Sequence, residues 1–305
     1  MEIRNEEIKL YDTLSSFYEA LGIPFTQEAE FTIHTTETFR QQYPSKSPLF
    51  RANYYTFVII HEGYGHSILD SHIYDTRPNT IYFTNPGHVK GFEIIEPYQG
   101  YLITFSETFL KQYVGDNVFE EFPFLLAEIV PPHYLDATIF SVFAGLCAQL
   151  LSEYHSDSLY KYTILSNLLV VFLLKIKERF WNRYNPQVEG TQSSQIVTTF
   201  KKHLEHHFRA LRTGDAQRAF QVQDFARMQN LHPNYFSTVI KSKTGKTVNT
   251  WIVEKTIAEA QALLAQTHQP IKAIAYQLGF QEPTHFSRFF KKHTGLTPGA
   301  FRRTR

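Results

Sequence analysis

One segment of this 305-residue chain occurs twice in its C-terminal part, at residues 233–247 and again at residues 283–297. The two copies share a proline, a Phe-Ser pair, a lysine, a Thr-Gly pair and a final threonine. A short apolar helical pattern precedes each copy, at residues 225–228 and 274–278. Self-similarity at a fixed offset indicates one structural unit used twice. Two helices joined by a tight turn form a helix-turn-helix, so the repeat predicts two DNA-recognition units in one chain.

Charge is distributed unevenly along a chain that is nearly neutral as a whole. Residues 191–305 carry 17 Lys and Arg against 6 Asp and Glu, whereas the first 190 residues carry 13 against 23. Such asymmetry is typical of a nucleic-acid-binding end joined to something else. The alternative is two ordinary solvated surfaces of opposite sign. Because the basic end coincides with the repeat, we expect it to contact phosphates.

Cysteine usage and hydropathy indicate where the protein acts. A single cysteine, Cys147, can form neither an intrachain disulfide nor a metal-binding cysteine pair. The N-terminus is charged and has no secretory apolar core. The most apolar stretch, residues 164–176, is too short to span a bilayer. We therefore expect a cytoplasmic protein without a membrane partner.

Residues from about 30 to 105 are rich in β-branched and aromatic side chains and are broken by turn signals. A turn is expected at residues 61–65 and another at residues 75–79. The strands are expected at residues 54–60, 67–73, 80–83 and 100–105. Short strands at this spacing predict a small barrel or jelly roll, a fold that often holds a ligand.

After residue 105 the pattern becomes helical. Two long apolar-rich runs, residues 138–154 and 159–181, are expected both to pack on the barrel and to form a dimer seam. Residues 185–194 combine Pro, Gly and polar side chains without periodicity, as an interdomain linker does. The remainder is predicted to be all-helical, with helices at residues 196–208, 222–228, 233–243, 248–265, 271–278, 282–292 and 298–302.

The region from Val222 to Arg303 resembles the DNA-binding domain of AraC/XylS-family transcription regulators. The second unit carries the match, through Ile274-Ala275, Leu278-Gly279-Phe280, Phe286-Ser287-Arg288-Phe289-Phe290-Lys291-Lys292, Thr294-Gly295, Thr297-Pro298 and Phe301-Arg302. The second turn is one residue longer than the first, as it is in that family. The N-terminal part is loosely similar to the family's cupin-like sensory domain.

The resemblance implies an α+β multidomain fold, with an N-terminal cupin-like β-barrel, a helical dimerisation segment and a C-terminal all-α domain with two helix-turn-helix motifs. The expected domains are a sensory, ligand-binding barrel at residues 1–105, a helical dimerisation segment packed on it at 106–184, a linker at 185–194 and an AraC-type DNA-binding domain at 195–305.

The predicted function is a sequence-specific transcription regulator, not an enzyme, that binds an asymmetric two-box site in successive major grooves. Its expected partners are double-stranded promoter DNA, a second copy of the chain, a small-molecule effector and, for an activator, RNA polymerase. No cofactor is expected. The alternatives are a metal-dependent cupin enzyme fused to a DNA-binding tail, or an effector-independent regulator whose barrel only dimerises. The sequence leaves open the effector, the target genes and the sign of regulation.

Helical spacing selects the side chains that face DNA. The residues expected to form the buried stripes are Phe236, Val239 and Ile240 in the first recognition helix and Phe286, Phe289 and Phe290 in the second. The candidates for base contact are Asn234, Ser237, Thr238, Thr284, His285, Ser287 and Arg288. The candidates for phosphate contact are Lys241, Lys291, Lys292, Arg302 and Arg303.

Arg288 is the strongest candidate for base contact, because a guanidinium fits O6 and N7 of guanine in a bidentate pair. The alternative for Arg288 is a phosphate contact or a surface salt bridge. Asn234 suits adenine, or caps its helix instead. Thr238 stands where many members of the family carry a longer side chain. We therefore expect methyl contacts from the first unit and most hydrogen-bonded specificity from the second.

Aromatic side chains on the expected strands suggest a ligand pocket. The candidates for its lining are Tyr55, Phe57, Phe83, His88 and Tyr101, although aromatic residues can equally well just fill a barrel. The sequence alone does not decide which face of each strand points inward. The His-x-His of metal-binding cupins is absent, so no metal site is expected.

Overall fold

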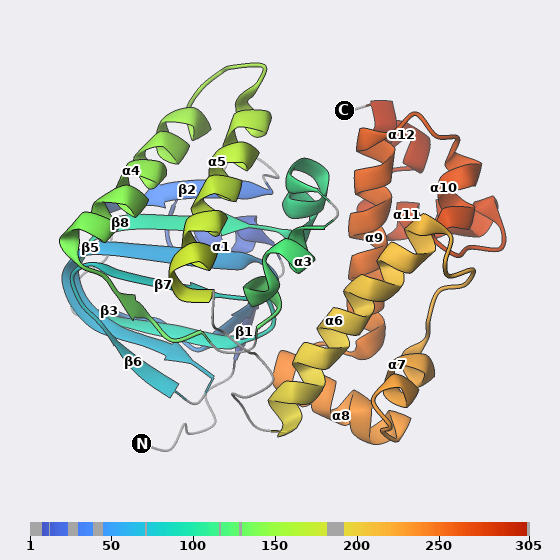
Figure 1. Cartoon of the computed structure of the whole chain (residues 1–305), viewed down its shortest axis with the longest axis horizontal. Helices are drawn as coiled ribbons and strands as arrows, with labels where there is room; N and C mark the ends of the chain where they lie inside the picture. The colour runs from blue at the N-terminus through green and yellow to red at the C-terminus, as the bar shows by residue number, and fades with distance from the viewer. Residues whose placement is uncertain are drawn as a thin grey trace. The chain divides into compact units, whose positions relative to one another are not determined.

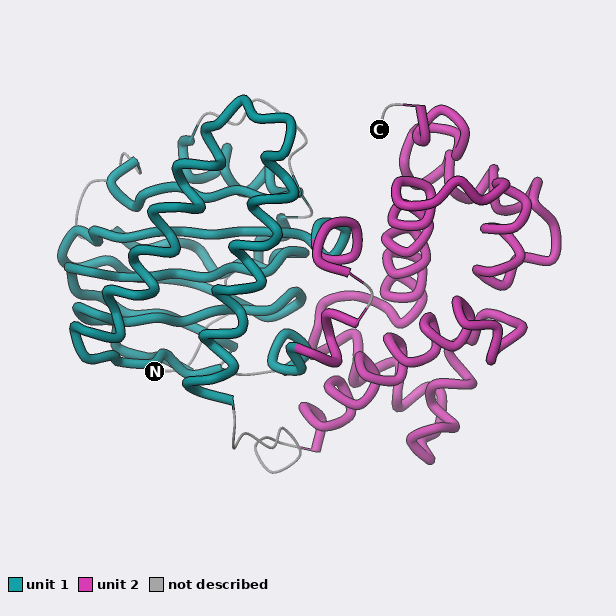
Figure 2. Tube along the Cα trace, turned by 45° about the horizontal axis from the view of Figure 1, so that its top comes forward, with its two compact units in different colours: residues 1–109, 122–186 teal, residues 110–121, 187–305 magenta. Residues whose placement is uncertain are grey.

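The computed structural model describes residues 8–11, 13–23, 30–38, 45–70, 72–115, 117–127, 130–181 and 192–303. The chain divides into two compact units, shown in teal and magenta in Figure 2. Residues 1–109 and 122–186 form the first unit, and residues 110–121 and 187–305 form the second. The class of fold is the expected one, a mixed α and β first unit followed by a helical second unit.

The first unit is built on a nine-stranded sheet among its described residues (Figure 1). Its strands are β1 (Lys9–Tyr11), β2 (Phe31–Thr35), β3 (Ser45–Lys46), β4 (Phe50–Ala52), β5 (Tyr55–Leu69), β6 (His72–Thr76), β7 (Thr80–Thr84), β8 (Val89–Phe105) and β9 (His133–Tyr134). The main order is β1-β4-β8-β5-β7-β9, with β2 and β3 also on β8 and β6 on β5. Only the β1–β4 pair is parallel among the described strands.

The turn expected at residues 61–65 is absent, because β5 continues through it for 15 residues. Pairing with β8 shifts register three times between Ile60 and Gly65, so the chain bends by bulging rather than by reversing. Gly63 adopts a φ of +105° there, and a Cβ would lie 2.4 Å from the carbonyl oxygen of Pro97. The glycines of this stretch are needed for close approach to β8, which a sequence pattern cannot distinguish from a turn.

Helices pack on both faces of the sheet. The two long helices, α4 (Ala137–Tyr154) and α5 (Lys161–Ile176), lie over one face of the sheet (Figure 1), where Phe172 meets Phe57 edge to face at 5.5 Å. Helix α1 (Leu14–Ala20), which the sequence analysis did not identify, packs into the opposite side. Its Tyr18 hydroxyl is 2.6 Å from Thr32 Oγ1, which ties the helix to β2.

By length and composition alone, α4 is the one described helix that could cross a membrane, with a mean hydropathy of 1.3. Its buried residues recur every three or four positions and pack on the sheet, as those of an amphipathic core helix do. They are Phe140, Phe143, Cys147 and Leu150.

The second unit is all-helical in the part of the chain that the structure describes. Its long helices and helix-turn-helix elements are α6 (Gln192–Thr213), α7 (Val222–Met228), α8 (Pro233–Thr244), α9 (Val248–Gln266), α10 (Ile271–Gln277), α11 (Pro283–Thr294) and α12 (Pro298–Arg303). Each lies within four residues of the bounds expected from the sequence, apart from the longer C-terminal end of α6. Most of the expected linker lies outside the described residues, and residues 192–194 begin α6 instead.

Residues 110–121 also belong to the second unit, although the sequence assigned them to the segment that packs on the barrel. They contain a π-helical turn (Leu110–Val114) and helix α3 (Val118–Glu121). Lys111 is almost fully buried and forms ion pairs with Glu205 of α6 at 3.0 Å and with Glu259 of α9 at 3.1 Å. The chain thus leaves the first unit after β8, packs against α6 and α9, and returns.

Candidate DNA interface and ligand cavity

The two predicted helix-turn-helix units are present, as α7–α8 and α10–α11. Residues 229–232 form the first turn and residues 278–282 the second, so the second is one residue longer. Asn230 is left-handed in the first turn, with φ of +55°, and Gly279 is left-handed in the second, with φ of +82°. A Cβ on Gly279 would lie 2.6 Å from the backbone nitrogen of Ala219, so the second turn packs closely on the loop before α7.

The recognition helices α8 and α11 end in the same way. Gly245 follows α8 and Gly295 follows α11, each with φ of +76°, and each donates its N–H to the carbonyl oxygen of a lysine at 2.9 Å. These are glycine caps at equivalent positions of the repeat. Helix α9 then joins the two helix-turn-helix units over 19 residues, about 28 Å at the ordinary helical rise.

Separate cores support the two recognition helices. Phe236, Val239 and Ile240 of α8 are buried with α6, α7 and the start of α9. Phe286 and Phe290 of α11 are buried with α10, α12 and the end of α9. Phe289 is only half-buried, so its expected place in the buried stripe is wrong. Its ring contacts those of Phe280 and His293 at the edge of the core.

The side chains expected to contact bases lie on the outer faces of α8 and α11. Asn234, Thr238, Thr284, His285 and Arg288 are exposed, and Ser237 and Ser287 are half-buried. Among the phosphate candidates, Lys241, Lys291, Lys292 and Arg303 are exposed, whereas Arg302 is half-buried. The repeat therefore presents two similar polar and basic helical faces.

Hydrogen bonds within α8 decide what its outer face can offer. The Oγ1 of Thr238 donates to the carbonyl oxygen of Asn234 at 2.9 Å, which leaves the threonine methyl group outward. The helix is capped by His232, whose Nδ1 accepts from the N–H of Asn234 at 3.3 Å. The Asn234 side chain is therefore not the capping group.

A carboxylate occupies the start of α11. Glu282 Oε2 accepts from Thr284 Oγ1 at 3.3 Å and lies 3.5 Å from Nε2 of His285. Both of these base-contact candidates thus interact with an acidic neighbour, which would oppose the approach of a phosphate. Arg288 lies one helical turn beyond Thr284, and its exposed guanidinium is the longest donor group on this face.

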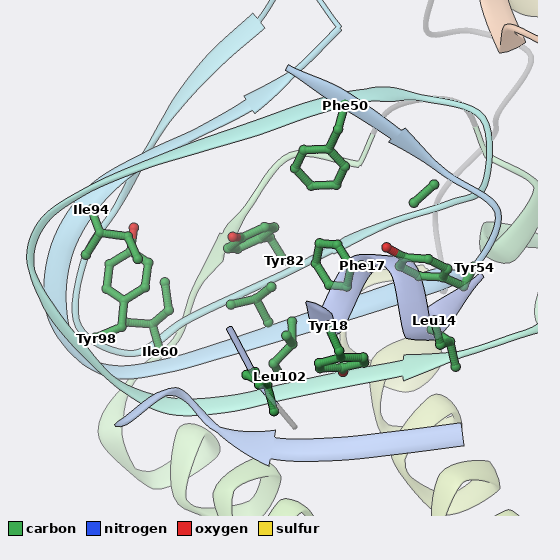
Figure 3. Close-up of a cluster of buried hydrophobic side chains, with 13 residues drawn as sticks. Leu14, Phe17, Tyr18, Phe50, Tyr54, Ile60, Tyr82, Ile94, Tyr98 and Leu102 are labelled. Atoms are coloured by element: carbon green, nitrogen blue, oxygen red, sulfur yellow. The ribbon is translucent and has the colours of Figure 1, made fainter. Parts of the chain in front are cut away.

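The barrel of the first unit encloses a cavity of about 80 Å³. Most of its wall is apolar, and Figure 3 shows Phe17 of α1 inside the barrel among Phe50, Tyr82 and Leu102. The lining residues are Phe17, Leu21, Thr36, Phe50, Thr56, Val58, Ser67, Ile68, Tyr82, Thr84, Lys90, Gly91, Phe92, Ile94, Tyr98 and Leu102.

None of the five expected pocket residues lines this cavity. Tyr55, Phe57 and Phe83 lie on the opposite face of β5 and β7, where the rings of Phe57 and Phe83 stack at 4.8 Å beneath the helices. Tyr101 lies near Cys147 of α4. Because alternate residues of a strand face opposite sides, the neighbours Thr56, Val58, Tyr82 and Thr84 point into the cavity instead.

His88 is buried outside the cavity, with its Nδ1 2.9 Å from Asp70 Oδ2. The other histidines of the barrel have different neighbours. His61 stacks on Phe140 and His66 lies 3.1 Å from Asp75. The described residues contain no group of three or more His, Cys, Asp or Glu side chains placed to hold a metal ion.

A barrel with an interior cavity, joined to paired helix-turn-helix units, defines a class of protein: a transcription regulator with a ligand-binding domain and a DNA-binding domain. Sequence comparison gives the same result. The AraC-like ligand binding domain matches residues 36–169, and a helix-turn-helix domain matches residues 225–304. The chain belongs to the AraC/XylS family of transcription regulators.

Two relatives illustrate the extent of the similarity. The arabinose operon regulatory protein of Escherichia coli is 26% identical over 160 residues, which are 52% of this chain and 51% of that protein. The uncharacterized HTH-type transcriptional regulator YobQ of Bacillus subtilis is 29% identical over 120 residues, 38% of this chain and 50% of the relative. The chain thus spans about half the length of these curated relatives.

Two solved structures are also similar. The C-terminal domain of AraT, a response regulator from Geobacillus stearothermophilus, is 30% identical, covers 38% of this chain and 89% of its own, and has a TM-score of 0.34. ToxT from Vibrio cholerae is 16% identical, covers 90% of this chain and 98% of its own, and has a TM-score of 0.39. The family assignment rests on the sequence matches.

Proposed function

We propose that this protein is a cytoplasmic, effector-responsive regulator that binds promoter DNA as a homodimer. Each chain would recognise an asymmetric site of two boxes in successive major grooves. The observation that carries the proposal is the equivalence of α8 and α11, which share a glycine cap and an outward polar face. Helix α9 belongs to both cores and so fixes the separation of the two helices. Successive grooves on one face of DNA are about 34 Å apart.

The two helix-turn-helix units would contribute differently to the DNA sequence specificity. In α11, Arg288 suits a bidentate contact with guanine. In α8, the bonded hydroxyl of Thr238 leaves its methyl group to contact thymine. Lys241 and Lys291, one turn further along each helix, are placed for phosphate contacts that any DNA sequence would satisfy.

Helix α5 supports the homodimer. Ile164, Asn167, Val171 and Leu174 are exposed and follow a spacing of three and four residues, the a and d pattern of a short coiled-coil seam. The apolar members of this seam are 38 to 42% exposed. A second copy of the chain would cover the same surface on both subunits, and the single asparagine would fix the register.

The route of response would follow the chain itself. Strand β8 lines the ligand cavity and ends at Phe105, five residues before the segment that packs with α6 and α9. A ligand that favours one arrangement of β8 would therefore bias the position of residues 110–121 and, through them, the DNA-binding unit. Whether transcription rises through contact with RNA polymerase or falls would depend on where the sites lie.

The proposal is tested by incubating the full-length protein with fragmented DNA from its source genome and sequencing what it retains. A shared motif of two boxes about one turn apart is expected. The Arg288→Ala variant should retain DNA with the first box preserved and one base of the second box relaxed. Enrichment without any motif, in the presence and absence of candidate effectors, would contradict sequence-specific binding.

A further inference from the structure

Resting on the ligand-binding role just proposed, the barrel cavity also indicates the chemistry of its ligand. We propose that the effector is an amphipathic organic acid, with a hydrocarbon body in the cavity and a carboxylate held by Lys90. The proposal depends on three features of the cavity: an apolar wall, a lysine within that wall, and a hydroxyl group available for a second polar contact.

The apolar wall comes from both sides of the barrel. Phe17 of α1, Phe50 of β4, Val58 of β5 and Leu102 of β8 all line the space. A second cavity of about 160 Å³ adjoins the first, since Phe17, Leu21, Phe50 and Phe92 line both. An extended hydrocarbon body that reached both spaces would lie along these four shared side chains. Burying each methylene group in such a space stabilises the complex by about 0.8 kcal/mol.

Lys90 supplies the charge. Its side chain lies in the wall with the residue only 4% exposed, and Nζ is 5.6 Å from the centre of the Tyr54 ring. Of the described residues that line the cavity, Lys90 is the one with a formal charge, and none is Asp or Glu. An ammonium group attracts an anion more strongly at low dielectric than in water. A carboxylate is therefore the head group that this wall would select.

Thr84 offers the second polar contact. Its Oγ1 is buried in the cavity wall and has no hydrogen-bond partner among the described residues. Thr56 lies opposite it in the β5–β7 register. Buried hydroxyl groups are normally hydrogen-bonded, and a ligand oxygen would complete this one.

The test uses full-length protein and isothermal titration calorimetry. Straight-chain carboxylates from hexanoate to dodecanoate are compared with the alcohols of equal length. At least one acid should bind saturably, and its alcohol should bind about tenfold more weakly or worse. Lys90→Met should lower the affinity for the acid about tenfold and leave that for the alcohol unchanged, whereas Lys90→Arg should keep the preference.

Lys9→Met is the matched control, because Lys9 is an exposed lysine of the same unit that lines neither cavity. Its loss should not change the acid affinity. Equal binding of acid and alcohol, or an acid affinity that survives Lys90→Met, would overturn the proposal. DNA selection is measured on the same samples: a protein that finds its two boxes but binds no acid contradicts the ligand class alone. Acid binding by a protein without sequence selection would leave the ligand class intact and reject the proposed function.

Discussion

Lys111 and Glu205 are 94 positions apart in the sequence, yet Nζ of the first donates to Oε2 of the second at 3.0 Å within a largely buried cluster. Lys255 pairs with Glu205 and also lies 3.3 Å from Glu259, and Arg212 is 3.2 Å from Glu259. Three cations and two carboxylates thus join α6, α9 and residues 110–121. Partners removed from such a cluster leave charges without compensation, so the cluster acts as a unit.

Replacing Glu259 with glutamine should destabilise the second unit by about 3–5 kcal/mol, because the buried Lys111 and Lys255 and the partly buried Arg212 lose their common partner. Burial alone would raise the pKa of Glu259, but Lys255, Lys111 and Arg212 lower it to about 2. The measurement is unfolding in urea, monitored through the fluorescence of Trp251. A Trp181→Phe background removes the other of the two tryptophans.

The control for Glu259 is Glu282→Gln in the same unit, which removes a contact between exposed partners, since Glu282 Oε2 lies 3.5 Å from Nε2 of His285. It should change the free energy of unfolding by no more than about 1 kcal/mol. Similar effects from both variants would show that the buried cluster is no more important than a surface pair.

Gly279→Ala should be markedly more damaging than Gly295→Ala. Both glycines are left-handed, with φ of +82° and +76°, so both variants carry a backbone cost of about 1–2 kcal/mol. At Gly279 the new Cβ also meets the backbone of Ala219 at 2.6 Å, whereas at Gly295 it meets nothing within 4 Å. Thermal unfolding of the two variants should differ by several degrees, and equal midpoints would contradict the close packing of the second turn.

Acid should destabilise the DNA-binding unit partly through His207. Burial, with a contribution from Arg218, lowers the pKa of His207 from 6.5 to about 4, and its Nε2 accepts from the N–H of Phe220 at 2.9 Å. Since the folded state holds the neutral ring, the unfolded state binds the extra proton between these pH values. The free energy of unfolding should therefore fall as pH drops from 6.5 to 4, by on the order of 1–2 kcal/mol.

His207→Gln keeps an acceptor and removes the titration. The difference in unfolding free energy between wild type and this variant should change with pH between 6.5 and 4 and stay constant above pH 7. Parallel pH curves for the two proteins would exclude His207 as a source of the acid sensitivity.

Arg288→Ala should weaken binding to the selected DNA site by about 1–3 kcal/mol, with the loss confined to one base position. Lys292→Ala is the comparison, since it should weaken specific and random DNA alike and lower the slope of affinity against salt by about 1. Fluorescence anisotropy on both DNAs at several salt concentrations measures both quantities. An equal loss on random DNA would make Arg288 a phosphate contact.

Thr238→Val should bind the selected site as the wild type does, because the Thr238 hydroxyl is already bonded to Asn234 within the helix. Thr238→Ala should lose about 0.8 kcal/mol, the worth of one buried methyl group. Replacing thymine with uracil in the first box should weaken the wild type and leave Thr238→Ala unchanged. A loss with valine would instead assign recognition to the hydroxyl.

The helical half of the fold could be predicted closely because its signals are local. Residues 222–228 were expected to form a helix and α7 has those bounds, since an apolar stripe between turn residues defines the helix by itself. The sheet depended on distant partners. Gly63 and Gly65 gave a turn-like pattern, but their function is close contact with β8. Strand alternation was visible, but the inward face is set by α1 on one side and by α4 and α5 on the other.

The candidate site residues show the same difference between helices and strands. Thr238 and Arg288 lie on outer helical faces as expected, because one buried stripe fixes the opposite face. Tyr55 and Phe57 are each one residue away from a cavity-lining position. Because successive strand residues point to opposite faces, a shift of one residue places the side chain on the wrong side of the sheet. Lys111 had no local signal at all, since its partners lie in α6 and α9.

Residues 110–121 complete the packing of α6 and α9. The DNA-binding unit is therefore not contained in a single continuous C-terminal segment that could be cut out and fused to another protein. A fusion of a foreign sensor to residues 187–305 would leave out Lys111 and the carbonyl groups of Lys111 and Gln112 to which Gln266 donates at 2.8 and 2.6 Å. A chimera of two family members that is joined only at the linker would combine α6 and α9 of one protein with residues 110–121 of the other. Transplanting the regulator into a biosensor therefore calls for a second crossover near residue 110, so that the segment travels with the helices it covers.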